Sequence, residues 1–228
     1  RASRTIPFVA KSINIPIAKI AAKVMVGKKL NELVNSLNRK KLDNFSVKES
    51  VFPFNKFDGV DLILGPEMKS TGEVMGLDKN FLSAFIKSQI ASGTNLPKKG
   101  NVFLSIDDDN KNKLTPIAKK LIKLNFNLIA TKGTGSFLKK NNLKVNIIKK
   151  VKEGSPHIVD SLLSGKIDLV INTTKTQHSI KDSYSIRRTS LINNIPYYTT
   201  IAGAKVAVDA IEFLKKNNLT VISLQTMH

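Results

Sequence analysis

A short run rich in glycine and hydroxyl side chains, residues 131–136, has the composition of a phosphate-binding loop. It reads Thr-Lys-Gly-Thr-Gly-Ser and lies between an apolar stretch typical of a buried strand and a stretch with helical spacing. Glycines let backbone N–H groups approach an oxyanion, and the start of a helix carries partial positive charge. Thr131, Lys132 and Thr134 add hydroxyl groups and a cation. The sequence therefore predicts a cradle for a small anion, against the alternative of a glycine-rich turn whose threonine caps the helix.

Polar residues also follow other predicted strands of the same sheet. Asn172, Thr173 and Thr174 end one strand, Lys111 lies just after the first strand, and Lys150 ends the third. In open parallel sheets, ligands bind beyond the carboxyl ends of the strands. We therefore expect these side chains to border one small-ligand pocket, although each lysine alone is equally well explained as a solvated surface residue.

Several other kinds of chemistry find no support in the sequence. With no cysteine, the chain has no disulfide, thiolate-bound zinc or thiol nucleophile. The three histidines, His157, His178 and His228, have no partners at metal-ligand spacing, and His157 is interpreted as a helix cap or packing residue. The acidic run at 107–109 lacks the spacing of a calcium loop and is interpreted as a turn with capping side chains.

From residue 101 onward, short apolar runs alternate with amphipathic stretches. This pattern predicts an α/β domain with about five strands in a parallel sheet covered by helices on both faces. The predicted strands are 102–106, 126–131, 145–151, 168–174, 196–200 and 221–224. The predicted helices are 112–125, 134–142, 156–165, 182–193 and 202–216.

The first part of the chain, residues 1–97, has a different pattern. Helical spacing covers 15–34 and 80–92, whereas 45–54 and 61–76 have the composition of strands and turns. The Gly, Pro and Lys residues of 93–100 indicate a linker, so we place a domain boundary between residues 97 and 98. Because this part begins abruptly and has few strands, we expect it to be the tail of a domain and the chain to be a piece of a longer protein.

The composition is that of a globular protein with an unusual charge. Of 228 residues, 41% are hydrophobic and 24% are charged, and the formal net charge is +20. Only five of the 37 cations are arginines and aromatic residues are sparse, which argues against nucleic acid and favours small anionic partners. No apolar run is long enough to span a bilayer and no signal peptide is evident, so we expect a soluble, cytoplasmic protein without a membrane partner.

Six segments of the chain resemble the large subunit of glutamine-dependent carbamoyl-phosphate synthase. They are residues 1–28, 45–76, 112–120, 130–134, 152–174 and 182–200. The resemblance implies that residues 1–97 end the second ATP-grasp domain, and that residues 98–228 form an allosteric domain with a methylglyoxal-synthase-like fold. It also implies an ATP-dependent ligase that makes carbamoyl phosphate from glutamine-derived ammonia and bicarbonate for pyrimidine and arginine biosynthesis. Its partners would be the rest of the large subunit and a glutaminase small subunit.

The allosteric domain of that family binds a nucleoside monophosphate, UMP or IMP. The matching motifs assign its contacts to Lys111, Thr131, Lys132, Thr134, Lys150, Asn172, Thr173, Thr174, Asp182 and Ser183. The chain departs from the family at Lys132, where histidine is frequent, and at Gln177, where a basic residue can occur.

A second family effector, ornithine, binds between the two parts, and the resemblance assigns Glu49 and Thr199 to it. Tyr198 stands where the family has aspartate, so we expect a weakened ornithine response. Arg1 and Arg4 would contact phosphate in the intact enzyme, which uses ATP with Mg²⁺ or Mn²⁺. The family's metal-binding Glu-x-Asn motif precedes the matched region, so we expect this chain alone to bind no metal or ATP and to make no carbamoyl phosphate.

Two alternatives remain at this level. A methylglyoxal-synthase-like lyase shares the fold and the phosphate loop, but its catalytic aspartate has no counterpart at residues 153–156, where a general base would be needed. A generic phosphate- or anion-binding module would rest on charge alone, and its binding would weaken steeply with salt.

Overall fold

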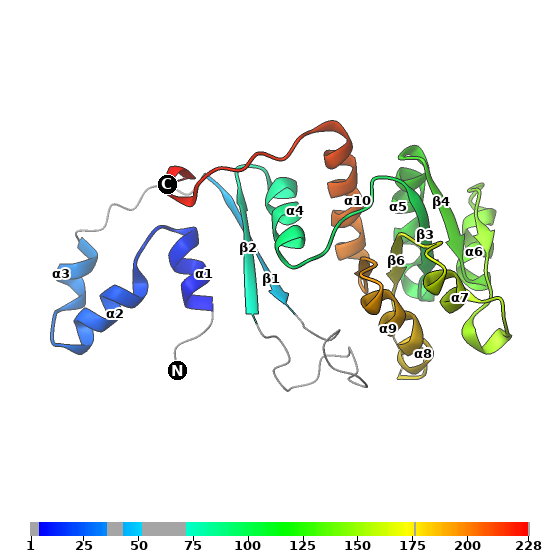
Figure 1. Cartoon of the computed structure of the whole chain (residues 1–228), viewed down its shortest axis with the longest axis horizontal. Helices are drawn as coiled ribbons and strands as arrows, with labels where there is room; N and C mark the ends of the chain where they lie inside the picture. The colour runs from blue at the N-terminus through cyan, green and yellow to red at the C-terminus, as the bar shows by residue number, and fades with distance from the viewer. Residues whose placement is uncertain (1–4, 36–42, 52–71, 176, 228) are drawn as a thin grey trace.

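The computed structural model describes residues 5–35, 43–51, 72–175 and 177–227. Two separate sheets organise the chain (Figure 1). Strands β1 (Phe45–Val51) and β2 (Gly72–Asp78) form an antiparallel pair, with Phe45 opposite Asp78 and Val51 opposite Gly72. The second sheet has five strands, and the sites predicted from sequence after residue 101 all lie on it.

The five-stranded sheet is entirely parallel, which confirms the predicted α/β class. Its strands are β3 (Gly100–Ser105), β4 (Phe126–Ala130), β5 (Asn146–Ile147), β6 (Leu169–Asn172) and β7 (Tyr197–Tyr198). Their spatial order is β5-β4-β3-β6-β7, so the first strand in sequence, β3, lies in the centre. The chain builds the sheet first to one side of β3 and then to the other, which places a crevice at the carboxyl end of β3.

Helices cover both faces of this sheet because its strands are apolar on both sides. Those that follow β3 are α5 (Lys111–Lys123), α6 (Lys132–Lys140), α7 (Ile158–Leu163), α8 (Gln177–Asp182), α9 (Tyr184–Ile192) and α10 (Ile201–Lys216). Val102 and Leu104 of β3 pack in a core with α5, α6 and α10, whereas Phe103 packs on the other face with α7 and α9. This alternation along a fully buried strand is the pattern expected of a parallel sheet.

The first part of the chain packs around the two-stranded sheet. Helix α4 (Phe81–Ala91) lies against β2, and Asn80 caps it by accepting hydrogen bonds from the N–H groups of Leu82 and Ser83. Gly76 permits this packing, since a Cβ there would lie 1.8 Å from the carbonyl oxygen of Ala84. Three helices precede the sheet: α1 (Thr5–Ser12), α2 (Ile17–Met25) and α3 (Leu30–Asn35).

Three sequence-predicted elements differ from the structure. The helical pattern over 15–34 is broken between α2 and α3 by Gly27, whose φ is +92°. The strand predicted over 145–151 is only β5, because its partner β4 ends at Ala130 and the pairing stops with Ile147. The helix predicted at 182–193 is α9, and a further helix that the sequence did not predict, α8, precedes it and ends at Asp182.

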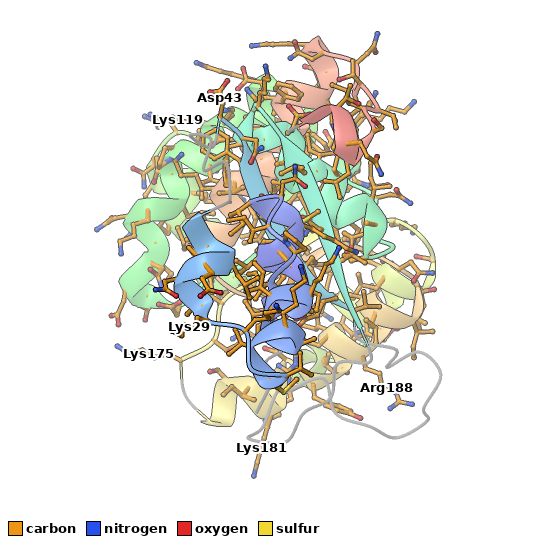
Figure 2. All side chains as sticks on the ribbon, turned by 90° about the vertical axis from the view of Figure 1, so that its left-hand side faces the viewer. Lys29, Asp43, Lys119, Lys175, Lys181 and Arg188 are labelled. Atoms are coloured by element: carbon orange, nitrogen blue, oxygen red, sulfur yellow. The ribbon has the colours of Figure 1, made fainter. Side chains whose placement is uncertain are left out.

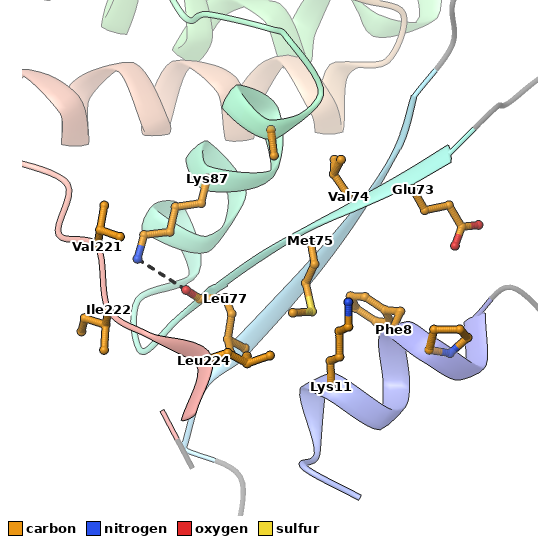
Figure 3. Close-up of a pocket in the computed structure, with 12 residues that line it drawn as sticks. Phe8, Lys11, Glu73, Val74, Met75, Leu77, Lys87, Val221, Ile222 and Leu224 are labelled. Carbon is orange, nitrogen blue, oxygen red and sulfur yellow. Dashed lines mark hydrogen bonds between the residues drawn. The ribbon is translucent and has the colours of Figure 1, made fainter. Parts of the chain in front are cut away.

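The strand predicted at 221–224 is wrong. After α10 the chain leaves the five-stranded sheet and crosses to β2 (Figure 1), and this apolar run pairs with no strand among the described residues. Val221, Ile222 and Leu224 instead border a groove of about 610 Å³ between β2 and α1, opposite Phe8 and Met75 (Figure 3). The groove is larger than the cavity at the sheet edge described below, and its lining is mostly apolar, with Lys11, Glu73 and Lys87 as its charged members.

An ion-pair cluster ties α10 to α5 and gives the fold an acid-sensitive contact. Lys120 lies 2.6 Å from Asp209 and 2.5 Å from Glu212. Hydrogen bonds from Lys120 and Lys216 lower the pKa of Glu212 from 4.5 to about 2. Burial alone would raise the pKa of Asp209, but hydrogen bonds from Lys120 and Lys205 lower it. Because both pKa values are lower in the folded chain, their stabilisation is present above the unfolded pKa values and is lost as pH falls.

We therefore expect Lys120→Met to lower the thermal unfolding midpoint at pH 7, and the difference from wild type to shrink as pH falls from 4.5 toward 2. Circular dichroism melts of both proteins across this range would measure it. A difference that stays constant down to pH 2 would contradict the assignment.

The surface charge is spread over many elements rather than gathered at one face. Figure 2 labels Lys29, Lys119 and Lys181, which are exposed and lie on widely separated segments. These three lysines are solvated surface residues. Within the described residues, each helix is too short or too polar to cross a membrane.

Candidate functional site

A cavity of about 510 Å³ lies beyond the carboxyl ends of the parallel strands. Four strand ends contribute to it: Ser105 and Ile106 follow β3, Thr131 follows β4, Lys150 follows β5, and Asn172 ends β6. Residues of α8 and α9 close the remaining side. The cavity therefore occupies the crevice at which open α/β sheets bind ligands.

The strand register aligns these ends. Ser105 is paired with Asn172, and Leu104 with Ala130. Beyond the last pairs, the N–H of Thr131 donates to the carbonyl of Leu104 at 3.2 Å, and the N–H of Thr173 donates to that of Ser105 at 3.0 Å. The two polar strand ends that the sequence placed at one edge are thus held on either side of β3.

Seven of the ten residues predicted for nucleotide binding line this one cavity. They are Thr131, Lys150, Asn172, Thr173, Thr174, Asp182 and Ser183. The other three, Lys111, Lys132 and Thr134, belong to the helices beside the cavity and do not line it. Lys132 is exposed on the first turn of α6.

Thr134 has a structural partner that the sequence did not reveal. Its residue is 1% exposed, and its hydroxyl accepts a hydrogen bond of 3.0 Å from the N–H of Ile106. The hydroxyl therefore fastens the first turn of α6 to the end of β3. At the start of α6, the N–H groups of residues 132–134 have no earlier helical turn to bond with, so they are donors available to an anion.

We expect Thr134→Val to lower the free energy of unfolding by about 1–3 kcal/mol, because it leaves the buried N–H of Ile106 without an acceptor. Thr134→Ser keeps the hydroxyl and should lose less than half of that. Urea denaturation of the two variants would measure the difference. Equal stability of Thr134→Val and wild type would contradict the role of this bond.

Lys111 lies against the same first turn of α6. A Cβ at Gly133 would be 3.7 Å from the Lys111 ammonium nitrogen, and the same ammonium forms an ion pair with Asp108. The lysine that the sequence placed after β3 thus reaches the glycine-rich loop, with a carboxylate as its present partner. An anion held by the start of α6 would be close enough to replace that carboxylate.

The acidic run 107–109 is the main feature of the cavity that the sequence analysis missed. Residues 108–110 form one turn of 3₁₀ helix, which confirms the predicted turn, but the Asp107 side chain makes no capping hydrogen bond, and all three aspartates line the cavity. The Asp107 carboxylate accepts hydrogen bonds from the Thr173 hydroxyl and the Asn110 amide. Burial acts to raise the pKa of Asp107, and these hydrogen bonds outweigh it and lower that pKa. The order of the strands could have revealed this: the run follows β3, and the loop after a central strand must lie between the loops that follow its two neighbours.

Ion pairs within the cavity neutralise two of its lysines. Lys152 lies 2.5 Å from Asp182, and Lys175 pairs with Asp109, which raises the pKa of Lys175. Within the described part of the chain, the ammonium of Lys150 pairs with no carboxylate, while its backbone N–H donates to Glu153 at 3.0 Å. Of the three lysines that line the cavity, Lys150 is therefore the one whose charge no carboxylate of the described residues neutralises.

The two residues predicted for ornithine lie in different surroundings. Glu49, on β1, accepts a hydrogen bond of 3.0 Å from the Gln89 amide, whose oxygen accepts one of 3.1 Å from the Tyr198 hydroxyl. Thr199 is exposed and lines a second cavity, of about 550 Å³, with Asn110 and Lys205. Glu49 and Tyr198 thus share Gln89 as a hydrogen-bond partner, whereas Thr199 lines a separate cavity.

The remaining candidates fall outside the cavity. His157 is the N-cap of α7, as predicted, and its Nδ1 accepts a weak hydrogen bond of 3.4 Å from the N–H of Asp160. Arg1, Arg4 and His228 lie outside the described residues, and the side chains of Gln177 and His178 are not described. Among the described residues, no three His, Asp or Glu side chains gather in a way that could hold a metal ion.

Comparison with known proteins gives consistent matches. Residues 113–199 match the family model of the MGS-like domain. The chain is 51% identical over 225 residues to a carbamoyl phosphate synthase large chain of Myxococcus xanthus, with 99% of this chain and 21% of the relative covered. It is 49% identical over 224 residues to that of Methanobrevibacter smithii, with 98% and 21% covered.

A relative from Methanopyrus kandleri is named carbamoyl phosphate synthase large chain, C-terminal section, and is 46% identical over 233 residues, with 100% of this chain and 43% of the relative covered. The chain thus spans 21% of the length of two of these relatives and 43% of the third. Residues 113–199 form an MGS-like domain, and the chain belongs, over nearly its whole length, with the C-terminal section of carbamoyl phosphate synthase large chains.

Proposed function

We propose that the cavity at the edge of the five-stranded sheet binds a nucleoside monophosphate, UMP or IMP, as a regulatory ligand. The observation that carries this proposal is that seven of the ten predicted contact residues, from three strand ends and the junction of α8 and α9, line one cavity. Its volume of about 510 Å³ suits a ligand of nucleotide size. The ligand's phosphate would lie toward Lys150 and the start of α6, where N–H donors and cations meet.

The same proposal assigns a role to each of the two parts of the chain. Residues 98–228 would be the allosteric domain, and residues 1–97 the end of an ATP-grasp domain whose remainder lies in the rest of a carbamoyl-phosphate synthase large subunit. In the complete cytoplasmic enzyme, with its glutaminase subunit, ATP and Mg²⁺ would serve the synthesis of carbamoyl phosphate for pyrimidine and arginine pathways. No step of that synthesis is assigned to the described residues, which contain no group suited to the metal.

The charges of the cavity favour this reading over a generic anion-binding module. Four aspartates line the cavity beside three lysines, and they would repel a polyanion that presents many phosphates. The carboxylates are also engaged: Asp107 with Thr173, Asp109 with Lys175, and Asp182 with Lys152. For this reason none of the three is positioned as the unpaired general base that a lyase of this fold would need.

Isothermal titration of UMP and IMP at 50 mM and 200 mM salt, roughly the range over which polyanion binding collapses, tests the proposal. We expect saturable, base-selective binding of one nucleotide that changes little with salt. Binding of heparin and both nucleotides alike, lost at the higher salt, would contradict it. Synthesis of carbamoyl phosphate itself is tested only in the complete enzyme.

The ornithine response is expected to be weak. Burial raises the pKa of Glu49, although its hydrogen bond with Gln89 opposes this, and burial also raises the pKa of Tyr198. An incoming ammonium group would have to displace Gln89, which Tyr198 holds in place. Titration of ornithine should give no saturable heat under conditions in which nucleotide binds, and Tyr198→Asp should strengthen the response. Tight, saturable ornithine binding by wild type would contradict this expectation.

A further inference from the structure

One buried cation beside the cavity, Arg187, has no counter-charge among the described residues. Arg187, on α9, is 8% exposed. One of its Nη atoms donates to the carbonyl of Ile180 at 2.9 Å, but its Nε has no hydrogen-bond partner. Among the residues that the structure describes, no carboxylate forms an ion pair with it. A guanidinium buried without a counter-ion is costly, so its retention calls for a source of negative charge.

The position of Arg187 points to the cavity as that source. Ser183 and Ile186, one helical turn and one residue earlier, line the cavity wall. On the inner side, Arg187 faces Tyr197: burial raises the pKa of Tyr197, while the bond from Asn172 and the nearby guanidinium oppose that rise. Asn172, 2% exposed and part of the cavity lining, donates its amide hydrogen to the Tyr197 hydroxyl at 2.7 Å. A line of polar contacts therefore runs from the guanidinium through Tyr197 to the cavity.

The other charges of the cavity provide little net positive charge for an anionic ligand. Lys152 and Lys175 are paired with aspartates, and Asp107 adds a further negative charge. A ligand phosphate would thus find only Lys150 uncompensated among the lining lysines. Because Arg187 is screened from water, its field acts on the cavity through a medium of low dielectric constant.

We propose that Arg187 is a positioning residue that supplies a buried positive charge to the anionic group of a ligand in this cavity, acting through Tyr197 and Asn172 rather than by touching the ligand. The inference rests on the proposed nucleotide site. It adds an explanation of why that site would prefer a ligand with a phosphate over one without. By Coulomb's law at an effective dielectric constant of about 20, a unit charge roughly 10 Å from a phosphate strengthens its binding by about 10- to 30-fold, which is the effect we expect.

The test compares UMP with uridine, which lacks the phosphate, by calorimetry at one salt concentration. In Arg187→Gln, which keeps a donor for the carbonyl of Ile180, we expect the ratio of UMP to uridine affinity to fall by about 10- to 30-fold. Arg188→Gln is the matched control: it removes the same charge from the next position of α9, and its ratio should stay within about twofold of wild type. Arg187→Lys keeps the charge and should retain most of the ratio.

The outcomes separate the inference from the proposed function. A wild-type chain that binds neither compound overturns the nucleotide site and this inference with it. Wild-type binding together with an unchanged ratio in Arg187→Gln overturns the inference alone. Equal loss in Arg187→Gln and Arg187→Lys also overturns it, because the positive charge would then not be the cause. Arg187→Met serves as the neutral variant if the glutamine variant does not fold.

Discussion

Replacing Lys150 with alanine is expected to weaken nucleoside monophosphate binding about 10- to 100-fold. A charge-assisted hydrogen bond to a phosphate contributes about 1.5–3 kcal/mol, which is that range of affinity. Lys150 follows β5 at the cavity, and the carboxylates of the described residues leave its ammonium unpaired, so its whole charge is available to a ligand. The neighbouring lysines of the cavity would first have to separate from Asp182 and Asp109. Calorimetric titration of UMP and IMP measures the effect.

Lys149→Ala is the matched control for this prediction. Lys149 is equally exposed and adjacent in sequence, but it does not line the cavity. The control variant should bind with an affinity within about twofold of wild type, because the effect of a distant surface charge is screened by salt. If the two variants lost affinity equally, general positive charge rather than Lys150 would explain the binding.

Gly76→Ala is expected to lower the free energy of unfolding of the β1–β2–α4 region by about 3 kcal/mol or more. The new Cβ would lie 1.8 Å from the carbonyl oxygen of Ala84 and 2.6 Å from the N–H nitrogen of Ser88. Both are backbone atoms of α4, so no side chain can rotate away and the helix itself must move from β2. Overpacking of this kind costs about 1–3 kcal/mol when side chains can adjust, and more when they cannot. Hydrogen exchange of the β1 and β2 amides measures the local loss.

The control lies on the same strand. Among the described residues, no heavy atom lies within 4 Å of a Cβ added at Gly72, so Gly72→Ala should be close to neutral. The pair also tests the proposed boundary between residues 97 and 98. If the five-stranded sheet is an independent domain, Gly76→Ala should bind UMP or IMP with the affinity of wild type. Loss of nucleotide binding in Gly76→Ala alone would contradict that independence.

The arrangement of the C-terminal sheet could be predicted because strand and helix periods alternate clearly after residue 101. Uninterrupted apolar runs such as 102–106 are typical of parallel strands buried on both faces, and the structure places β3 in the centre of the sheet. The run at 221–224 has the same apolar composition but forms no strand, because pairing depends on where the chain runs after α10 and not on composition alone. The limits of β5 were likewise set by its partner β4.

The location of the cavity followed from one rule, that strand ends of a parallel sheet meet at one edge. The sequence could not show how the polar groups there pair with one another. Thr134 is of a residue type that often contacts ligands, yet its hydroxyl accepts a hydrogen bond from the N–H of Ile106. Asp107, Asp109 and Asp182 bring negative charge into a site that was predicted mainly from its lysines and hydroxyl groups. Arg187 is buried beside this site, although arginines are usually exposed. The partners of Thr134, Asp107, Asp109 and Asp182 are 28 to 66 positions away in the sequence.

The central claim, that the cavity holds a nucleoside monophosphate, is tested most directly by titrating UMP and then IMP into isotopically labelled protein while following backbone amide signals by NMR. We expect saturable shifts of Thr131, Lys150, Thr173 and Ser183, which line the cavity, and of Gly133 at the start of α6, and none for the residues of β1. Saturable shifts centred on the groove between α1 and β2, or small shifts spread over surface lysines that vanish with salt, would contradict it.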